Sequence, residues 1–494
     1  MSEETELNEF LATFERDPAA ALDRHPPKFD ADGAPLAAPT SAFAADDIAN
    51  GRDVEGRDEY RKRHSAVDGG VIIRLQDILP GRAPYELSDR AERLVDRMVH
   101  TDLASMEAAG LRESTLAESP WSDDYWGIYR GILGCRYADP RFPGSSDWSE
   151  NHAYVRDRPA PAIAATGDAD AIDRLSPSEK YDLLIGDDAG TLTTKMWDEG
   201  RAYYERDGKV ETWMGICHGW AAAAYMLPRP RSAVTVLAAD GRTHVRFYPA
   251  DIKALASLLW ANTDTVSRFV GGRCNDKEPQ RDEVGRVVSA RCFDTNPGTW
   301  HMAVVNQIGA CKRSFVLDAT FDYEVWNQPV RGYSYRYFNP QLFRYVSTLE
   351  AATVPYGDFR RDWFRRYRSP AVASIVGIAM TLDYVVETTP SHATSDDQSR
   401  DEVNRVRYVY DLELDAQNKI IGDEWYTNRH PDFLWTPPPD GRARTAADAY
   451  ATGDWPEGQA LPDTWRRAAL RASEGYGGAA PLARIVERLI ELAR

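Results

Sequence analysis

The sequence has no long apolar run and no surplus of basic residues. Because no stretch approaches the length of a membrane span, no membrane-spanning helix is expected. The first residues lack the basic and apolar regions of a secretory signal, so the cytoplasm is the default location, with non-classical export as the alternative. The chain has only 59 Lys and Arg but 77 Asp and Glu, and the resulting formal charge of −18 repels phosphate backbones. Nucleic acid is therefore not an expected partner.

Cysteine is also scarce, and its spacing excludes two common roles. The five cysteines are odd in number, widely spaced and without a C-x-x-C pair. This pattern argues against a disulfide scaffold and against a structural zinc site. Cys274 and Cys292 are the one pair that could form a disulfide, and only in an oxidising environment.

Apolar and aromatic residues, by contrast, are plentiful enough for a folded protein. The 494 residues are 43% hydrophobic and include 14 Trp, 24 Tyr and 15 Phe. A chain of this length exceeds what one core usually supports, so two domains, or one large decorated domain, are expected. We expect four consecutive regions: a mobile arm (1–55), a mainly helical aromatic-rich region (56–190), a core with an antiparallel sheet (191–440) and a helical C-terminal extension (441–494).

The periodicity of the sequence predicts an α+β fold. Amphipathic helices are expected over about residues 1–20 and 481–494, and a capping box with proline at the first helical position predicts a helix from Ser176 to Gly186. β-Branched and aromatic runs separated by turn residues predict antiparallel strands. These runs are 304–308, 314–317, 375–386, 406–414 and 420–426.

A further helix is expected to begin near Cys217. The sequence reads Trp-Met-Gly-Ile-Cys-His-Gly-Trp over residues 213–220, followed by four alanines and no helix breaker until Pro228. The thiol would then lie at a helix N-terminus, where N–H groups and the helix dipole favour the thiolate. Gly215 and Gly219 allow a substrate backbone to approach closely. These features favour a nucleophile over the alternative, a small buried cysteine before a core helix.

A nucleophilic cysteine needs a base, and His301 is the candidate among nine histidines. Others lie in polar stretches, and His218 adjoins the cysteine on a helix, where neighbouring side chains diverge. His301 lies in an apolar run over 299–308 that predicts a strand.

The partner expected for this histidine is Asp318. Gly309-Ala310 suits the two-residue turn of a hairpin, and in that register His301 faces Asp318 on the next strand. The pair would fix the imidazole tautomer and stabilise the imidazolium. A loop longer by one residue would turn Asp318 to the other face. Asp322 and Asn306 are alternative orienting groups for the imidazole. If the segment has no catalytic role, it is a hairpin whose polar residues are exposed to solvent.

Together these residues resemble the transglutaminase elicitor family, whose familiar members are oomycete cell-wall transglutaminases, with related bacterial proteins. The motifs follow one another in the family's order over roughly residues 115–440. They are Trp-x-Gly-x-Cys-His-Gly-Trp at 213–220, Asn-Pro-Gly-Thr-Trp-His at 296–301, Val-Leu-Asp-Ala-Thr at 316–320, Glu-Val-Trp-Asn-Gln-Pro at 324–329, and two C-terminal motifs at 422–425 and 430–435. The chain departs from the family in lacking a recognisable signal and in having Asp423 where a second glycine is expected.

The resemblance implies a papain-like or transglutaminase-like core in which helices precede an antiparallel sheet, and a catalytic triad. Cys217 would attack a glutamine carboxamide of a protein donor, His301 would act as base, and Asp318 would orient it. A lysine or other amine, or water, would then take the acyl group. No cofactor is expected to be required, while a divalent cation and the oligomeric state stay open.

Three further residues are candidates for the oxyanion site or the substrate groove. The backbone N–H of Cys217 is the first candidate oxyanion donor, the indole of Trp213 or Trp197 is a second, and His218 is a groove candidate. The same triad would also suit a cysteine protease or a glutamine deamidase. A non-catalytic interaction protein on the same fold is the alternative from another class.

Overall fold

The chain folds into two compact units, each assembled from three stretches of sequence. The computed structural model describes residues 3–29, 89–263, 265–272, 279–289, 292, 295–319, 324–475 and 478–494. Unit 1 comprises 1–119, 267–385 and 403–438, and unit 2 comprises 120–266, 386–402 and 439–494. The four consecutive regions that the sequence predicts stay a prediction, and residues 30–55 of the expected N-terminal arm lie outside the described residues.

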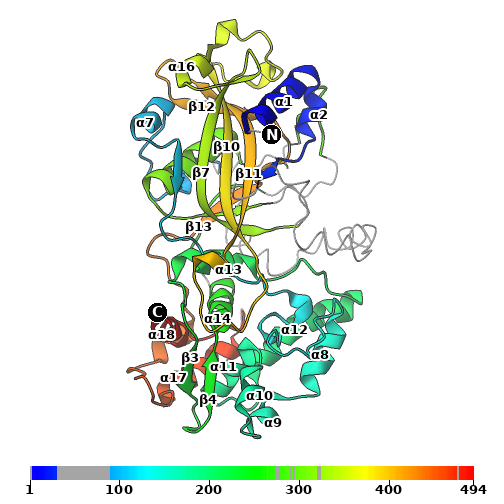
Figure 1. Cartoon of the computed structure of the whole chain (residues 1–494), viewed down its shortest axis with the longest axis vertical. Helices are drawn as coiled ribbons and strands as arrows, with labels where there is room; N and C mark the ends of the chain where they lie inside the picture. Colours follow the sequence, from blue (N-terminus) through cyan, green and yellow to red (C-terminus); the bar gives the residue numbers. More distant parts are fainter. Residues whose placement is uncertain are drawn as a thin grey trace. The chain divides into compact units, whose positions relative to one another are not determined.

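Unit 1 is built on an antiparallel sheet (Figure 1). Its strands are β1 (Lys28–Phe29), β2 (Glu113–Thr115), β5 (Arg268–Gly271), β6 (Val316–Asp318), β7 (Asn327–Asn339), β8 (Arg344–Val346), β9 (Thr353–Pro355), β10 (Ser374–Val386), β11 (Glu402–Leu414), β12 (Ile420–Trp425) and β13 (Phe433–Thr436). The main order is β1-β11-β10-β7-β6-β13-β5, with β12 beside β11, β2 and β8 beside β7, and β9 beside β10. Four of the five expected strands are confirmed.

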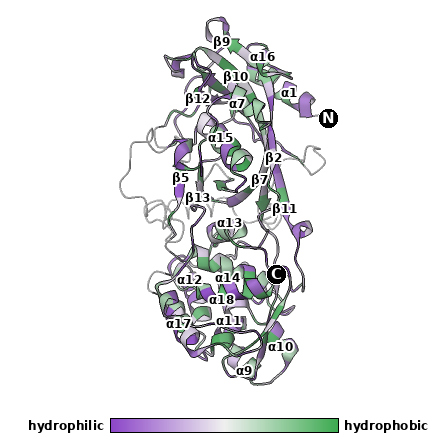
Figure 2. Cartoon of the chain, turned by 90° about the vertical axis from the view of Figure 1, so that its left-hand side faces the viewer, coloured by the Kyte–Doolittle hydropathy of each residue, from purple (hydrophilic) through white to green (hydrophobic). Residues whose placement is uncertain are grey.

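Helices of unit 1 cover the sheet. They are α1 (Glu3–Arg16), α2 (Pro18–Leu22), α7 (Leu103–Ala108), α15 (Pro297–Val304), a π-helical turn (Val305–Ala310) and α16 (Leu349–Ala352), with 3₁₀ turns at Ala91–Arg93, Tyr356–Asp358 and Arg365–Tyr367. The apolar face of α1 packs against residues of β7, β10 and β11, and its Phe14 ring stacks on Tyr426, which follows β12, with the ring centres 4.1 Å apart. α15 lies against β12, and the π-helical turn lies against β2 and β7 (Figure 2). Because the centre of β10 is buried throughout, it reads as a continuous apolar run.

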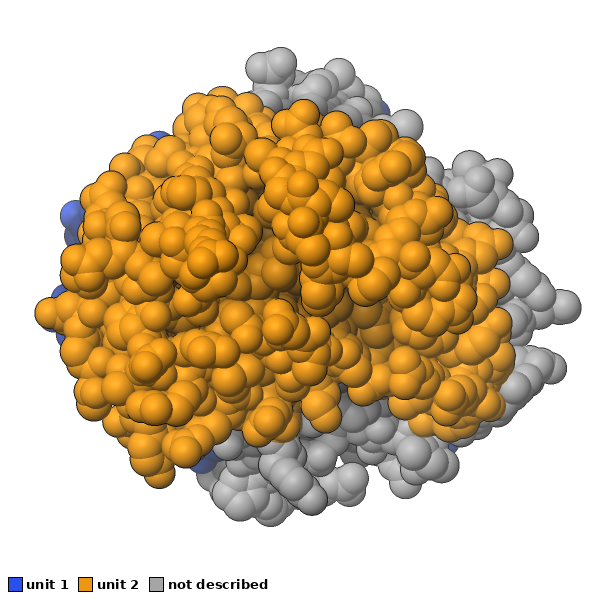
Figure 3. Space-filling model, turned by 90° about the horizontal axis from the view of Figure 1, so that it is seen from below, with its two compact units in different colours: residues 1–119, 267–385, 403–438 blue, residues 120–266, 386–402, 439–494 orange. Residues whose placement is uncertain are grey.

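Unit 2, which is drawn in orange in Figure 3, is mainly helical. Its elements are α8 (Trp148–Arg156), α9 (Ala160–Ala164), α10 (Ala169–Asp173), α11 (Pro177–Ile185), α12 (Thr191–Asp207), α13 (Cys217–Met226), α14 (Pro249–Ala261), α17 (Asp463–Glu474), α18 (Ala483–Leu492), and the hairpin of β3 (Val234–Leu237) and β4 (His244–Phe247), with 3₁₀ turns at Ile128–Arg130, Ile132–Gly134 and Ala446–Tyr450. The predicted capping box at Ser176 and the end of α11 at Gly186 (φ +65°) are confirmed. A fully buried ion pair, Lys180 to Asp251 at 2.6 Å, joins α11 to α14.

The combination of helices with an antiparallel sheet confirms the predicted α+β class. Among the described residues, no helix is long and apolar enough to cross a membrane.

Candidate functional site

Cys217 is the first residue of α13 in unit 2, as the sequence predicts. The backbone N–H of Ile216 donates to the Tyr125 carbonyl (2.8 Å), which holds the turn into the helix. Gly219 lies so close to the Ser257 carbonyl of α14 that a side chain at this position would clash with backbone. The Cys217 side chain is buried (7% exposed) and its thiol is not in a disulfide. The nucleophile candidate therefore lies at a rigidly packed helix N-terminus.

The three groove candidates also lie in unit 2. Trp213 and His218 are buried beside Cys217 in the chain, at 7% and 6% exposure. Trp197, on α12, is likewise buried, and its indole packs on the turn at Gly131 and Gly134, leaving no room for a side chain there. The indole nitrogen of Trp197 is thus directed at this turn.

His301 lies in unit 1 on helix α15, so the strand predicted over 299–308 is wrong. The helix begins after Asn296, whose side-chain oxygen accepts the N–H of Thr299 (2.8 Å), with Pro297 at the first helical position. All residues of α15 except Met302 are buried, so the helix shows no amphipathic period. An apolar run without such a period cannot be told from a buried strand by its sequence pattern.

The predicted hairpin turn at Gly309-Ala310 is consequently wrong as well. Both residues belong to the π-helical turn that extends α15. Asp318 ends β6 and pairs with Asn327 of β7, not with His301. Its Oδ1 accepts the backbone N–H of Trp326 (3.1 Å).

The imidazole of His301 is fully buried among aromatic side chains. Its Nδ1 is hydrogen-bonded to the Tyr410 hydroxyl on β11 at 2.9 Å, and the Tyr335 ring lies edge-on at 5.0 Å. Burial lowers the pKa of His301 to about 3, so the ring is neutral near pH 7. Nε2 has no hydrogen-bond partner among the described residues. At Nδ1, the orienting contact expected of Asp318 is thus made by Tyr410.

Of the two alternative orienting groups, only Asn306 lies among the described residues. Asn306 uses its side chain to bind the backbone of Val99, His100 and Met302, with all four contacts between 2.8 and 2.9 Å. Asp322 lies outside the described residues.

A group of carboxylates surrounds the N-terminus of α15. Asp423 accepts the N–H of Gly298, and Asp89 accepts the N–H of Asn296 at 2.9 Å. Burial raises the pKa of Asp423 well above its usual range and that of Asp89 to about 7. These carboxyls, with the Asn296 cap, fix the start of the helix that carries His301.

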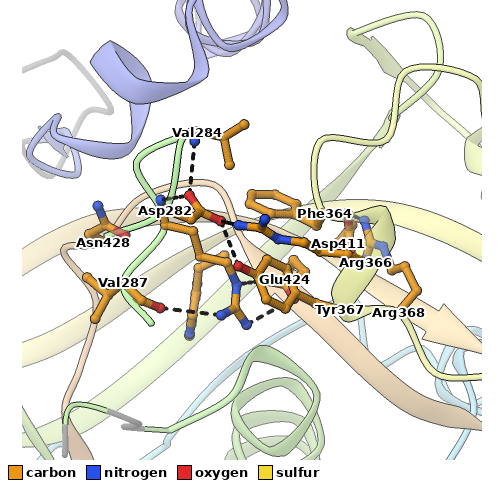
Figure 4. A network of polar contacts seen from close by, with 12 residues as sticks. Asp282, Val284, Val287, Phe364, Arg366, Tyr367, Arg368, Asp411, Glu424 and Asn428 are labelled. Carbon is orange, nitrogen blue, oxygen red and sulfur yellow. Dashed lines mark hydrogen bonds and ion pairs between the residues drawn. The ribbon is translucent and has the colours of Figure 1, made fainter. Parts of the chain in front are cut away.

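The same carboxylates line a cavity of about 520 Å³ in unit 1, together with Glu413, Glu424 and Arg286. Arg286 binds Glu424 through two hydrogen bonds (2.7 and 3.0 Å) and lies 4.1 Å from the centre of the Tyr367 ring. In Figure 4, Glu424 and Tyr367 lie near Asp282, whose Oδ2 accepts a hydrogen bond from the Tyr367 hydroxyl at 2.8 Å. Glu424, in the sequence motif at 422–425, thus forms a structural ion pair with Arg286 at the cavity wall.

The described residues include no metal-binding cluster and one disulfide-bonded cysteine. Among the described residues, no three or more His, Cys, Asp or Glu side chains are placed to hold a metal ion. Cys292 is disulfide-bonded, whereas Cys135, Cys217 and Cys311 are not in disulfides. Cys274, the expected partner of Cys292, lies outside the described residues.

Sequence reasoning missed Tyr410 and the capping role of Asp423. Tyr410 lies in the buried part of β11, between Val409 and Leu412, where a tyrosine is typical of core packing. Asp423 stands out in the sequence because a glycine is expected at that position. The Asn-Pro pair at 296–297 is the sequence signal for the start of α15, the helix to which Asp423 contributes an acceptor.

Comparison with known proteins finds one family. The sequence model of the transglutaminase elicitor family matches residues 90–451. Among solved structures, the chain is similar to the crystal structure of the GP42 transglutaminase from Phytophthora sojae, at 21% identity and a TM-score of 0.47 over 80% of this chain and 99% of that one. No curated protein matches.

Proposed function

Because the chain belongs to the transglutaminase elicitor family, we propose that it is a transglutaminase-like acyltransferase that forms a Cys217 thioester with a glutamine side chain. The observation that supports this most directly is the place of Cys217, which is not in a disulfide and is the first residue of α13. A helix N-terminus stabilises the thiolate, which is the nucleophilic form.

In the proposed first half-reaction, the sulfur of Cys217 attacks the carboxamide carbon of a protein glutamine. His301 takes the thiol proton at Nε2, and the carbonyl oxygen becomes an oxyanion. We propose the backbone N–H of Cys217 as a donor to this oxyanion. When the intermediate collapses, the C–N bond breaks and His301 gives its proton to the departing ammonia, leaving a γ-glutamyl thioester.

In the second half-reaction, an amine nitrogen of lysine attacks the thioester carbon. His301 removes a proton from the attacking nitrogen, the C–S bond breaks, and the thiolate is regenerated. Water attacking in place of the amine would yield glutamate. Asp318, fully buried in the same unit as His301, is proposed to stabilise the imidazolium by its charge.

The test is incorporation of a labelled primary amine into a glutamine-bearing protein with blocked lysines. We expect incorporation by the native chain and none by Cys217→Ala. Cys311→Ala is the matched control, because Cys311 is likewise not in a disulfide and lies in unit 1. Equal incorporation by native and Cys217→Ala protein would end the proposal.

Two other outcomes would each identify an alternative. Ammonia released without amine incorporation would indicate a glutamine deamidase, and cleaved peptide bonds would indicate a protease. Neither product, with a folded chain, would indicate a non-catalytic interaction protein.

A further inference from the structure

The tautomer of His301 decides which ring nitrogen can act as a base. Burial keeps the imidazole neutral near pH 7, so one nitrogen carries a hydrogen and the other presents a lone pair. Only the nitrogen with the lone pair can take a proton from a thiol. The neighbours of Nδ1 therefore matter more than the position of the ring alone.

Tyr410 has one hydroxyl hydrogen and two neighbours that could receive it. Its oxygen lies 2.9 Å from Nδ1 of His301 and 3.8 Å from Sδ of Met380 on β10. A thioether sulfur can only accept a hydrogen bond, whereas Nδ1 can donate or accept. All three side chains are fully buried, so bulk water does not compete for these contacts. Burial also raises the pKa of Tyr410 well above its usual range, so the hydroxyl keeps its hydrogen.

The two tautomers differ in how many of these hydrogen bonds they allow. If Nδ1 carries the hydrogen, it donates to the Tyr410 oxygen, and the hydroxyl donates to Met380. If Nε2 carries the hydrogen, the hydroxyl turns to Nδ1, Met380 loses its donor, and a buried N–H is left where the described residues offer no acceptor. The first arrangement makes two hydrogen bonds. The second makes only one and leaves the buried Nε2–H without an acceptor, and a buried donor without an acceptor is the costlier defect.

We propose that Tyr410 and Met380 are positioning residues that hold His301 as the Nδ1–H tautomer and leave Nε2 as its basic nitrogen. The use of Nε2 as a base rests on the proposed acyl transfer. The tautomer itself does not, so it can be tested even in a chain without activity.

The direct test is nitrogen NMR of the full chain with ¹⁵N-labelled histidine at pH 7, with the His301 signals assigned by their loss in His301→Gln. We expect Nδ1 to resonate as a protonated nitrogen and Nε2 as a nitrogen with a lone pair. The opposite pattern in the native protein would overturn the proposal without any variant.

Met380→Leu tests the sulfur, because leucine fills a similar volume without an acceptor. We expect the Nε2–H population of His301 to increase and kcat to fall, with KM unchanged. The control is Met106→Leu, at another fully buried methionine of unit 1, which should change neither. An unchanged tautomer ratio in Met380→Leu would contradict the role of the sulfur.

Tyr410→Phe tests the hydroxyl. We expect the preference for Nδ1–H to be lost and kcat/KM to fall by about 10- to 100-fold, less than the roughly 10²- to 10⁴-fold loss typical of removing a general base. A native tautomer ratio in Tyr410→Phe would overturn the proposal. An inactive native chain with the expected tautomer would instead refute only the proposed acyl transfer.

Discussion

Helices α13 and α15 carry the two residues proposed to react, and their N-termini are built in opposite ways. α13 starts on Cys217 after Ile216, whose hydrocarbon side chain cannot accept a hydrogen bond. α15 starts after Asn296, which caps it, and receives a second acceptor from Asp423. The comparison teaches that a helix N-terminus can favour a reacting anion or can fix the position of its own helix. We propose that unit 2 uses the first option and unit 1 the second.

The largest expected effect tests whether α15 exists to position a base. His301→Gln should lower kcat for amine incorporation by about 10²- to 10⁴-fold, because a general base is lost. His430→Gln is the matched control: His430 is also buried in unit 1 with its pKa lowered to about 3, and it stacks on Trp425 at 4.5 Å. Equal losses in both variants would indicate damage to the fold.

The next effect concerns the thiol at the start of α13. We expect a thiol-directed electrophile to modify Cys217 at least about tenfold faster than Cys135 and Cys311, because a stabilised thiolate is the reactive form. Cys135, in the same unit, is the control, since burial raises its pKa to about 11. Mass spectrometry of the modified peptides measures the rates. Equal rates would remove the distinction between the two helices.

A third test uses the opposite pH dependence of one buried group from each unit. The pKa of His430 is lowered by burial to about 3, so the unfolded chain binds more protons between pH 6.5 and 3 and His430 destabilises the fold as pH falls. The pKa of Asp123 in unit 2 is raised by burial to about 8, so this carboxyl destabilises the fold as pH rises through about 4 to 8.

Each group contributes a slope of at most about 1.4 kcal/mol per pH unit. Relative to the native chain, His430→Gln should therefore gain free energy of unfolding from pH 7 to pH 5, and Asp123→Asn should gain it from pH 5 to pH 7. Urea unfolding at the two pH values measures both. If both variants gained free energy of unfolding in the same direction of pH change, the opposite pH dependences assigned to His430 and Asp123 would be contradicted.

The smallest expected effect tests the cap of α15 itself. Asp423→Gly removes the acceptor for the Gly298 N–H, and Asn296→Ala removes the N-cap, so each should lower the free energy of unfolding by about 1 kcal/mol. Asp423→Asn keeps an acceptor oxygen and should lose less. Thermal or urea unfolding gives these values, and a glycine variant as stable as native protein would show that the cap is dispensable.

Local signals predicted much of the fold, and they failed where burial removed the pattern. The start of α13 and the capping box of α11 depend on neighbouring residues, and both are confirmed. Strands β10 and β11 were visible as long β-branched and aromatic runs. The run at 299–308 failed, because a helix that is buried on nearly every side has no polar face to mark its period.

The candidate site was less predictable, because its contacts join distant parts of the sequence. Cys217 and His301 were chosen from their local context. The hydrogen bond from His301 to Tyr410 spans 109 positions, and neither residue marks the other in the sequence. The register that was to pair His301 with Asp318 depended on a turn that the π-helical extension of α15 replaces.

The threading of the chain through both units bears on how the protein is made. Unit 1 needs residues up to 438, and unit 2 needs residues up to 494. A ribosome must therefore synthesise the chain as far as residue 438 before the first of the two units has all its parts. Domains generally fold as their own residues emerge, but here both wait for late segments. The nascent chain must keep its early apolar stretches from aggregating throughout that time.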